Sequence, residues 1–267
     1  MRLEELQGSS ALVTGGASGL GEATVRALAA VAAHCVVYDR DSRRCEQVAE
    51  EVGGTACVGD VADAARMEEA FALAARAGHV RVAVSCAGVG WDEPLIQRPG
   101  APSPLEGFER VVRVNVVGVY NLLRCAGAAI AEAPPLADGE RGVIVTTSSI
   151  AGIDGHGGRR TAYAASKAAV EGLTLPAARA LADHGVRVVC IAPGIMDTPM
   201  NRGVFDAATS QEMANELVPF PHRLGRPEEF ADLVLTVCRS GYLNATHVRL
   251  DGGMRMPARN VPWTAQS

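Results

Sequence analysis

The run Thr14-Gly15-Gly16-Ala17-Ser18-Gly19-Leu20-Gly21 is the most informative motif in this chain of 267 residues. It follows the apolar run Ser10–Thr14, which predicts a buried strand, and it opens the run Gly19–Val31, which predicts a helix. Glycines in a strand-to-helix turn allow the backbone to bend sharply and to approach a ligand, and the N-terminus of a helix attracts anions. By itself the turn indicates either a pyrophosphate-binding loop or a tight turn with a structural role only.

Runs rich in β-branched residues alternate with longer runs rich in Ala and Leu along nearly the whole chain. This alternation is typical of βαβ units, which build parallel sheets through right-handed crossovers. The predicted strands are Ser10–Thr14, Cys35–Tyr38, Thr55–Val58, Val80–Ser85, Gly142–Thr147, Val186–Ile191 and His247–Leu250. The predicted helices are Gly19–Val31, Ser42–Val52, Ala64–Ala77, Leu105–Ala133, Tyr163–Asp183 and Pro227–Arg239. We therefore predict an α/β fold, a single Rossmann-type doubly wound domain over residues 1–267 with a seven-stranded parallel sheet flanked by helices.

Three irregular stretches follow predicted strands: Gly90–Pro104, Asp154–Arg160 and the 196–222 segment. Ligands bind outside the carboxyl ends of the strands in open α/β sheets, so these loops are expected to line a binding site. The 196–222 segment is long enough to be a substrate lid. Its apolar residues suit an acyl chain or a steroid better than a sugar, or they reflect ordinary packing: Met196, Met200, Val204, Phe205, Met213, Leu217 and Phe220.

Composition and charge exclude several classes of protein. The 25 basic and 30 acidic residues give a net charge of −5, the wrong sign for broad binding to nucleic acid. The longest uncharged stretch, Leu6–Gly21, is shorter than the roughly 20 apolar residues of a membrane span. The first residues, Met-Arg-Leu-Glu-Glu, do not resemble a targeting peptide, so we expect a cytoplasmic protein without membrane contact. The seven cysteines are widely scattered, as are the histidines, and predict neither disulfides nor a metal site.

Asp39 ends the second predicted strand, 18 residues beyond Gly21. A carboxylate near this distance from the glycine turn binds the adenosine ribose hydroxyls of a dinucleotide. It also repels the 2′-phosphate of NADP, which favours NAD as the cofactor. Arg40 leaves the alternative open, because its guanidinium is suited to accept that phosphate.

Lys167 is the one lysine among 25 basic residues; the other 24 are arginines. An ammonium and a guanidinium differ in shape and hydration, so a lone lysine indicates a position that arginine does not suit, or chance. Tyr163 lies four residues earlier, which places both side chains on one face of the predicted helix. A phenol is a poor base at neutral pH, and a nearby ammonium favours its ionised form. The alternative is a surface tyrosine and a solvated lysine.

From Thr14 to about Gly253 the sequence resembles the short-chain dehydrogenase/reductase family. The resemblance rests on the Gly-x3-Gly-x-Gly turn followed, in order, by Asp60-Val61, Ser85-Cys86-Ala87-Gly88, Asn115, Ser149, Tyr163-x3-Lys167 and Pro193-Gly194. Each motif is weak alone, and together in this order they are specific. The first two residues of Ser85-Cys86-Ala87-Gly88 depart from the usual Asn-Asn.

The resemblance implies four catalytic residues. Tyr163 would exchange a proton with the alcohol or carbonyl oxygen, and Lys167 would lower the pKa of Tyr163 and bind the nicotinamide ribose. Ser149 would orient the substrate oxygen, although it lies 14 residues before Tyr163 where the family has 13; Ser148 is the alternative. Asn115 would hold a water of a proton relay, or it satisfies an irregularity of its helix.

The resemblance also implies an NAD site. Its residues would be Gly15, Ser18, Gly19, Leu20, Gly21, Asp39, Asp60, Val61, Cys86, Ala87, Gly88, Tyr163, Lys167, Pro193, Gly194, Met196 and Thr198. Asp60 and Val61 would contact the adenine, and the turn at Pro193 would hold the nicotinamide amide. Cys86 would be a small apolar contact rather than a nucleophile, because no neighbour in sequence would activate a thiolate.

Within the family, the sequence is most similar to the type II 3-hydroxyacyl-CoA dehydrogenases, which also act on hydroxysteroids. The similarity is carried by residues 14–21, Gly142-Val-Ile-Val, Gly172-Leu-Thr-Leu-Pro and the segments starting at Val218 and Val248. It implies interconversion of a secondary alcohol and a ketone with NAD, here a 3-hydroxyacyl-CoA and a 3-oxoacyl-CoA, and it implies a homotetramer. A hydroxysteroid or another secondary alcohol is the alternative substrate, and an NAD-binding protein without turnover is a further alternative.

Overall fold

The computed structural model describes residues 1–156, 158–202 and 206–257. Its centre is a seven-stranded parallel sheet with the order β3-β2-β1-β4-β7-β8-β9. The strands are β1 (Ser10–Thr14), β2 (His34–Asp39), β3 (Thr55–Val58), β4 (Val80–Ser85), β7 (Gly142–Thr147), β8 (Val186–Pro193) and β9 (Thr246–Leu250). The predicted Rossmann-type fold is therefore confirmed. Both ends of each predicted strand lie within two residues of the ends of the corresponding observed strand.

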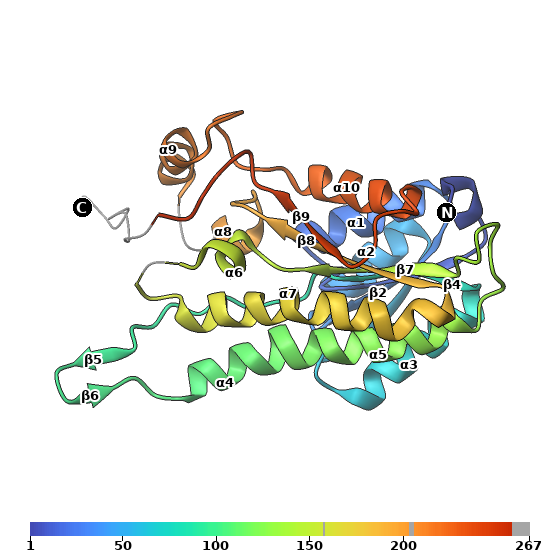
Figure 1. Cartoon of the computed structure of the whole chain (residues 1–267), viewed down its shortest axis with the longest axis horizontal. Coiled ribbons are helices and arrows are strands. Elements are labelled where there is room, and N and C mark those ends of the chain that lie inside the picture. Colours follow the sequence, from blue (N-terminus) through green and yellow to red (C-terminus); the bar gives the residue numbers. More distant parts are fainter. Residues whose placement is uncertain (157, 203–205, 258–267) are drawn as a thin grey trace.

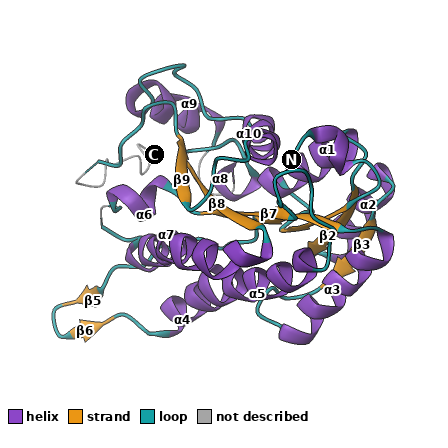
Figure 2. Ribbon diagram, turned by 45° about the vertical axis from the view of Figure 1, so that its right-hand side comes forward, coloured by secondary structure: helices purple, strands orange, loops and turns teal. Residues whose placement is uncertain are grey.

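Helices cover both faces of the sheet (Figures 1 and 2). One face carries α1 (Gly19–Ala30), α2 (Ser42–Val52) and α10 (Pro227–Arg239), whose apolar residues join β1 and β2 in one buried cluster. The other face carries α3 (Ala64–Ala77), α5 (Gly118–Ala131) and α7 (Thr161–Leu181), which share a second cluster with the same sheet. The strands are nearly continuous apolar runs because both of their faces are buried in this way.

The strand order reverses between β1 and β4, which lie side by side with Thr14 opposite Ser85. The connections from their carboxyl ends leave toward opposite faces of the sheet, and a crevice opens between them. The glycine turn after β1 and the loop after β4 form the two walls of this crevice. The topology thus places the predicted phosphate loop where an open α/β sheet binds its ligand.

The predicted helix Leu105–Ala133 is not regular, which corrects the sequence-based expectation. It consists of α4 (Glu106–Val112), a π-helical turn η2 (Arg113–Val117) and α5. The irregular turn contains Asn115, whose side chain bonds to other elements as described below. The combined helix Glu106–Ala131 is long and apolar enough to cross a membrane by length and composition alone. Its apolar side chains are accounted for by packing, because 56% of the most apolar window is buried within the fold.

Two of the three stretches predicted as irregular contain short elements that the sequence did not reveal, and another such element comes just before the remaining stretch. Gly90–Pro104 holds a small hairpin of β5 (Ile96–Arg98) and β6 (Ala101–Pro102), which projects from the body in Figure 1. A short helix α6 (Ile150–Asp154) precedes the loop before α7. The 196–222 segment holds α8 (Pro199–Arg202) and α9 (Ala207–Leu217), while Val204 and Phe205 lie outside the described residues. A 3-10 helix opens the chain at Leu3–Leu6, and another, Ala182–His184, follows α7.

Candidate active site

A cavity of about 1240 Å³ lies at the carboxyl ends of the strands. Every residue predicted to bind the cofactor lines it, from the glycine turn to the segment after β8: Gly15, Ser18, Gly19, Leu20, Gly21, Asp39, Asp60, Val61, Cys86, Ala87, Gly88, Tyr163, Lys167, Pro193, Gly194, Met196 and Thr198. Ser149 also lines the cavity, and Asn115 is fully buried behind it. Residues from eight segments of the chain thus converge on one site.

The glycine turn has a geometry that side chains would not permit. Gly15 has φ +67°, and a Cβ there would lie 2.7 Å from the backbone nitrogen of Ala87. A Cβ on Gly21 would lie 2.0 Å from the carbonyl oxygen of Gly15. Ser18 is the N-cap of α1 and its side chain makes no capping bond, so the amide groups of the first helical turn are left for a ligand. This turn fits a pyrophosphate.

Asp39 occupies the far end of the cavity with its carboxylate fixed. Its two oxygens accept hydrogen bonds from the backbone N–H groups of Ala17 and Asp41, both at 3.1 Å. Arg40 is exposed beside it, lines the same cavity and makes no ion pair with a residue in the described part of the chain. A fixed negative charge and an unpaired guanidinium therefore flank the place expected for the ribose.

The wall next to Asp39 is built by Asp60 and Val61. Asp60 accepts a hydrogen bond from the N–H of Ala62 at 2.9 Å and holds the Tyr38 hydroxyl through its carbonyl oxygen at 2.8 Å. Val61 packs so closely on the long helix that a Cβ on Gly118 would lie 2.5 Å from its Cγ2. The loop after β3 is thereby fixed, and its apolar edge is suited to a flat heteroaromatic ring.

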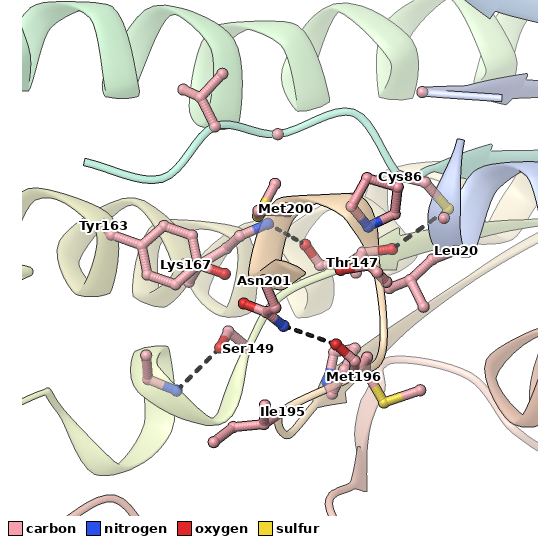
Figure 3. A pocket seen from close by; sticks show the side chains of 18 of the residues that line it. Leu20, Cys86, Thr147, Ser149, Tyr163, Lys167, Ile195, Met196, Met200 and Asn201 are labelled. Atoms are coloured by element: carbon pink, nitrogen blue, oxygen red, sulfur yellow. Dashed lines mark hydrogen bonds between the residues drawn. The ribbon is translucent and has the colours of Figure 1, made fainter. Parts of the chain in front are cut away.

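Lys167 is buried, with 6% of its surface exposed, and its Nζ donates a 2.9 Å hydrogen bond to the carbonyl oxygen of Thr147. The same Nζ lies 5.8 Å from the centre of the Tyr163 ring. The Tyr163 hydroxyl has no hydrogen bond to another described residue and lines the cavity. Figure 3 shows Tyr163, Lys167 and Ser149 around one pocket. The predicted pairing of tyrosine and lysine on one helix face is thus present.

The two candidate serines differ in their surroundings. The Ser148 hydroxyl is buried and donates a 2.9 Å hydrogen bond to the carbonyl oxygen of Lys167, so it holds α7 against the end of β7. The Ser149 hydroxyl caps α6 by accepting a 3.2 Å hydrogen bond from the N–H of Ala151, and its own proton is not used within the described chain. Ser149 can therefore donate to a ligand, which agrees with the preference for Ser149.

Asn115 makes three side-chain hydrogen bonds inside the protein, which use both hydrogens of its amide. Its Oδ1 accepts from the N–H of Val89 at 2.9 Å, and its Nδ2 donates to the carbonyl oxygen of Val89 and to Ser166 Oγ, both at 3.0 Å. Ser166 in turn donates to the carbonyl oxygen of Tyr163 at 2.7 Å. Asn115 therefore ties the loop after β4 to the first turn of α7, and the π-helical turn is what directs it there.

Cys86 lines the site, and its buried surroundings favour the uncharged thiol over the thiolate. Burial raises the pKa of its thiol to about 12, and the Thr147 hydroxyl is 3.9 Å from the sulfur. Gly88 is next to the polar groups of the site, because a Cβ there would lie 3.4 Å from Asn115 Oδ1 and 3.5 Å from Lys167 Nζ. A thiol with so high a pKa is inert, in agreement with its prediction as an apolar contact.

The turn after β8 closes the site from the other side. Gly194 donates to the carbonyl oxygen of Leu250 at 2.9 Å, and a Cβ there would lie 2.9 Å from Asp251 Cα. Thr198 packs on the phosphate turn, since a Cβ on Gly19 would lie 3.3 Å from its side chain. Asn201, which the sequence did not single out, donates a 2.7 Å hydrogen bond to the carbonyl oxygen of Met196. No motif marks Asn201, because its role depends on the path of the chain.

The glycine cradle, the fixed carboxylate and the tyrosine–lysine pair define a nicotinamide dinucleotide oxidoreductase. The family model of the short chain dehydrogenases matches residues 9–209, so the chain belongs to this family of enzymes, which use NAD or NADP.

The comparisons with individual proteins cover nearly the whole chain. The chain is 39% identical over 259 residues to human 3-hydroxyacyl-CoA dehydrogenase type-2, covering 94% of this chain and 97% of the relative. The crystal structure of 3-hydroxyacyl-CoA dehydrogenase type-2 from Mycobacterium avium is similar with a TM-score of 0.88 and 41% identity, covering 94% of this chain and 98% of that one. A 7α-hydroxysteroid dehydrogenase in complex with NADH and 7-oxo glycochenodeoxycholic acid has a TM-score of 0.83 and 26% identity, covering 95% and 97%.

Proposed function

We propose that this enzyme interconverts a 3-hydroxyacyl-CoA and a 3-oxoacyl-CoA with NAD as its cofactor. The observation that carries the chemistry is the convergence of Ser149, Tyr163 and Lys167 on one cavity that also contains the glycine turn. The substrate class is supported by the whole-chain similarity to enzymes named 3-hydroxyacyl-CoA dehydrogenase type-2. It is also supported by the apolar residues that the 196–222 segment and the chain after β9 contribute to the cavity.

Bound between the glycine turn and the Pro193-Gly194 turn, the nicotinamide dinucleotide would accept or donate the hydride. The other roles belong to side chains of the protein. The Ser149 hydroxyl donates a hydrogen bond to the substrate oxygen and stabilises the charge that develops on it. The Tyr163 hydroxyl takes the proton of the alcohol in oxidation and returns it to the oxygen in reduction. The Lys167 ammonium, 5.8 Å from the ring, stabilises negative charge on the phenol oxygen.

Asn115 affects the reaction indirectly, through the residues to which it is hydrogen-bonded. Its bonds to Val89 and Ser166 fix the backbone that presents Tyr163 and the loop next to Lys167. Its amide has no donor hydrogen left, and one lone pair of Oδ1 stays available for a water. A role in a proton relay and a role in satisfying the helix irregularity are therefore both compatible with this geometry.

The proposal of NAD rests on Asp39. Both of its oxygens are held in place by backbone N–H groups, so its negative charge does not move away from a ligand at the ribose position. A 2′-phosphate there would be repelled at close range. Arg40 offsets this repulsion in part and limits the expected selectivity.

A hydroxysteroid is the second candidate substrate. The cavity has an apolar side formed by Met213, Leu217 and Met254, and a rigid apolar ring system would also bury its surface there. The similarity to a hydroxysteroid dehydrogenase at 26% identity supports the same possibility.

We also propose a homotetramer and a cytoplasmic location. The long helix Glu106–Ala131 and the residue before it expose large apolar side chains, including Leu105, Phe108, Val117 and Tyr120, as an oligomer interface requires. All seven cysteines are free, as is usual in a reducing compartment. Light scattering would give the mass of the assembly, and a monomer would overturn the first of these proposals.

The function is tested by the initial rate of NADH oxidation with acetoacetyl-CoA, repeated with NADPH and with 7-oxo bile acids. We expect turnover of the thioester with NADH, at least ten times faster than with NADPH. Tyr163→Phe measured in parallel separates enzyme-catalysed turnover from background. A rate with steroids and none with thioesters would overturn the proposed substrate while leaving the oxidoreductase intact. Fluorescence of bound NADH would show whether the cofactor binds in the absence of a rate.

A further inference from the structure

Five of the seven methionines of the chain line the cavity: Met196, Met200, Met213, Met254 and Met256. The first three belong to the 196–222 segment, and the last two follow β9. Methionine is unbranched and polarisable, so a wall of methionines adapts to apolar groups of different shape. These five residues are here called the methionine wall, and two of them, Met254 and Met256, lie on a piece of chain that returns from the sheet to the cavity.

The return of the chain after β9 is made by the turn Asp251-Gly252-Gly253. Gly252 and Gly253 have φ +60° and +83°, a conformation that glycine adopts readily. The N–H of Gly253 donates to Asp251 Oδ1 at 2.9 Å, and a Cβ on Gly252 would lie 2.8 Å from the carbonyl oxygen of Phe220. The turn is therefore pressed against the end of the 196–222 segment, and it directs Met254 toward the cavity.

Arg249, near the end of β9, holds this returning chain through four hydrogen bonds to three residues. It forms a bidentate ion pair with Asp154, at 2.7 and 2.9 Å, and contacts Asp251 at 2.6 Å. It also donates to the carbonyl oxygen of Met254 at 2.9 Å. Asp154 accepts a further hydrogen bond from the N–H of Met256 at 3.2 Å. The hydrogen bonds from Arg249 hold the pKa of Asp154 below its usual range, so the pair is charged at neutral pH.

Met254 is 1% exposed and packs between two parts of the site. It shares a buried cluster with Ile150, the residue after Ser149, and with Ala214 and Val218 of the 196–222 segment. Asp154 ends the same short helix that Ser149 begins. The ion pair of Arg249 and Asp154 therefore connects the apolar wall to the helix that presents the Ser149 hydroxyl.

We propose that Arg249 is a positioning residue, and that its ion pair with Asp154 fixes Met254 and Met256 as the subsite for the apolar end of the substrate. The proposal rests on the proposed function, because it assigns the acyl chain of the thioester to this subsite. A short acyl chain does not extend to the wall, whereas a long one does. The ion pair then controls selectivity for chain length more than it controls the chemical step.

The test compares acetoacetyl-CoA with 3-oxododecanoyl-CoA in the wild type, Arg249→Met, Asp154→Asn and the double variant. We expect each single variant to raise KM for the long substrate about tenfold and to change KM for the short one less than twofold, the size of effect that follows from losing part of an apolar contact. The double variant should show no further increase, because both changes break the same ion pair. Arg249→Lys should recover part of the affinity.

Two controls keep the result interpretable. Arg26→Met removes an exposed arginine that pairs with Glu22 and Glu51 on the outer side of α1, and it should leave both substrates unchanged. Met256→Ala leaves the ion pair intact and should reproduce the loss for the long substrate, even if an Arg249 variant fails to fold. Equal losses for both substrates, or additive losses in the double variant, would overturn the positioning role. No wild-type rate with either thioester would instead overturn the proposed function, and with it the assignment to an acyl chain.

Discussion

Lys167 and Thr147 are joined by a hydrogen bond of 2.9 Å from Nζ to the carbonyl oxygen at the end of β7. The bond spans 20 residues of sequence and fixes the ammonium of α7 at the carboxyl end of the sheet. Ser148 returns a hydrogen bond to the carbonyl oxygen of Lys167 itself. The two hydrogen bonds thus fix α7 to the end of β7 at Lys167, the one lysine of the chain.

Arginine should not replace Lys167. The site around Nζ is closed by Thr147 and Gly88, and a planar guanidinium is larger and shaped differently from an ammonium. We expect Lys167→Arg to lower kcat about 100-fold, the range of general acid–base effects. We also expect lower thermal stability, because the larger guanidinium does not fit the closed site. Arg26→Lys, an exposed change in the opposite sense, is the control for kcat. A rate within a factor of two of the wild type would show that the shape of the cation is unimportant.

Tyr163→Phe should abolish turnover and leave NADH binding nearly intact. The substitution removes the hydroxyl that exchanges the proton and keeps the ring beside Lys167, so we expect a loss in kcat of about 1000-fold. Stopped-flow or steady-state rates measure the loss, and NADH fluorescence measures binding. Tyr242→Phe, on a fully exposed residue that follows α10, is the matched control. Retained turnover in Tyr163→Phe would remove this residue from the mechanism.

Asn115→Ala should lower both stability and activity. The variant leaves the N–H and carbonyl of Val89 without their partner, and each unsatisfied buried group costs about 1–3 kcal/mol. Because Ser166 also loses a bond, Tyr163 should be presented less firmly and kcat should fall. Chemical denaturation and kcat are measured together. Asn244→Ala, which loses the bond to the N–H of Val188, should reduce stability alone. Equal effects of the two variants on kcat would argue against a special role for Asn115.

Asp39→Ala should relax the preference against NADP. Removing the fixed carboxylate removes the repulsion of a 2′-phosphate and leaves Arg40 beside the ribose position, so we expect the ratio of kcat/KM for NADH over NADPH to fall about tenfold or more. Arg40→Ala, made in the wild type, should change the ratio in the opposite direction. An unchanged ratio in Asp39→Ala would mean that another residue discriminates the two cofactors.

The enzyme should resist thiol reagents near neutral pH. Burial raises the pKa of Cys86 from 9.0 to about 12, so its reactive thiolate is about 1000-fold rarer at a given pH. The thiolate would form only as the pH rises toward that value. We expect full activity after treatment with iodoacetamide at pH 8, with the extent of labelling followed by mass spectrometry. Rapid inactivation that bound NADH prevents would contradict this expectation.

Much of the site was predictable because its parts are local in sequence. The glycine turn requires small residues at fixed spacings, and the pairing of Tyr163 with Lys167 requires one helical turn, so both leave a pattern in the chain. The same holds for Asp39 at the end of β2. The preference for Ser149 over Ser148 came from a resemblance, and the hydrogen bonds of the two hydroxyls agree with it.

The elements that the sequence did not reveal are those that depend on distant partners. The long helix was predicted as regular, but the bonds of Asn115 to Val89 and Ser166 accompany a π-helical turn. The hairpin of β5 and β6 was hidden in a stretch rich in Pro and Gly. The spacing of apolar residues indicates which face of a helix or strand is buried. It does not indicate which single side chain forms a hydrogen bond to another element.

From the sequence alone we predicted the family, the seven strands of the main sheet, the long helices and a set of cofactor-binding residues. These predictions rest on short-range patterns and on motifs whose residues lie close together in the chain. The tertiary structure was needed to see how Asn115 supports Tyr163. It was also needed to find that Arg249 and Asp154, 95 residues apart, form the ion pair behind the methionine wall. An ion pair of this kind depends on where two chain segments meet in space. That position is set by the packing of the sheet and its helices, and no local pattern of residues encodes it.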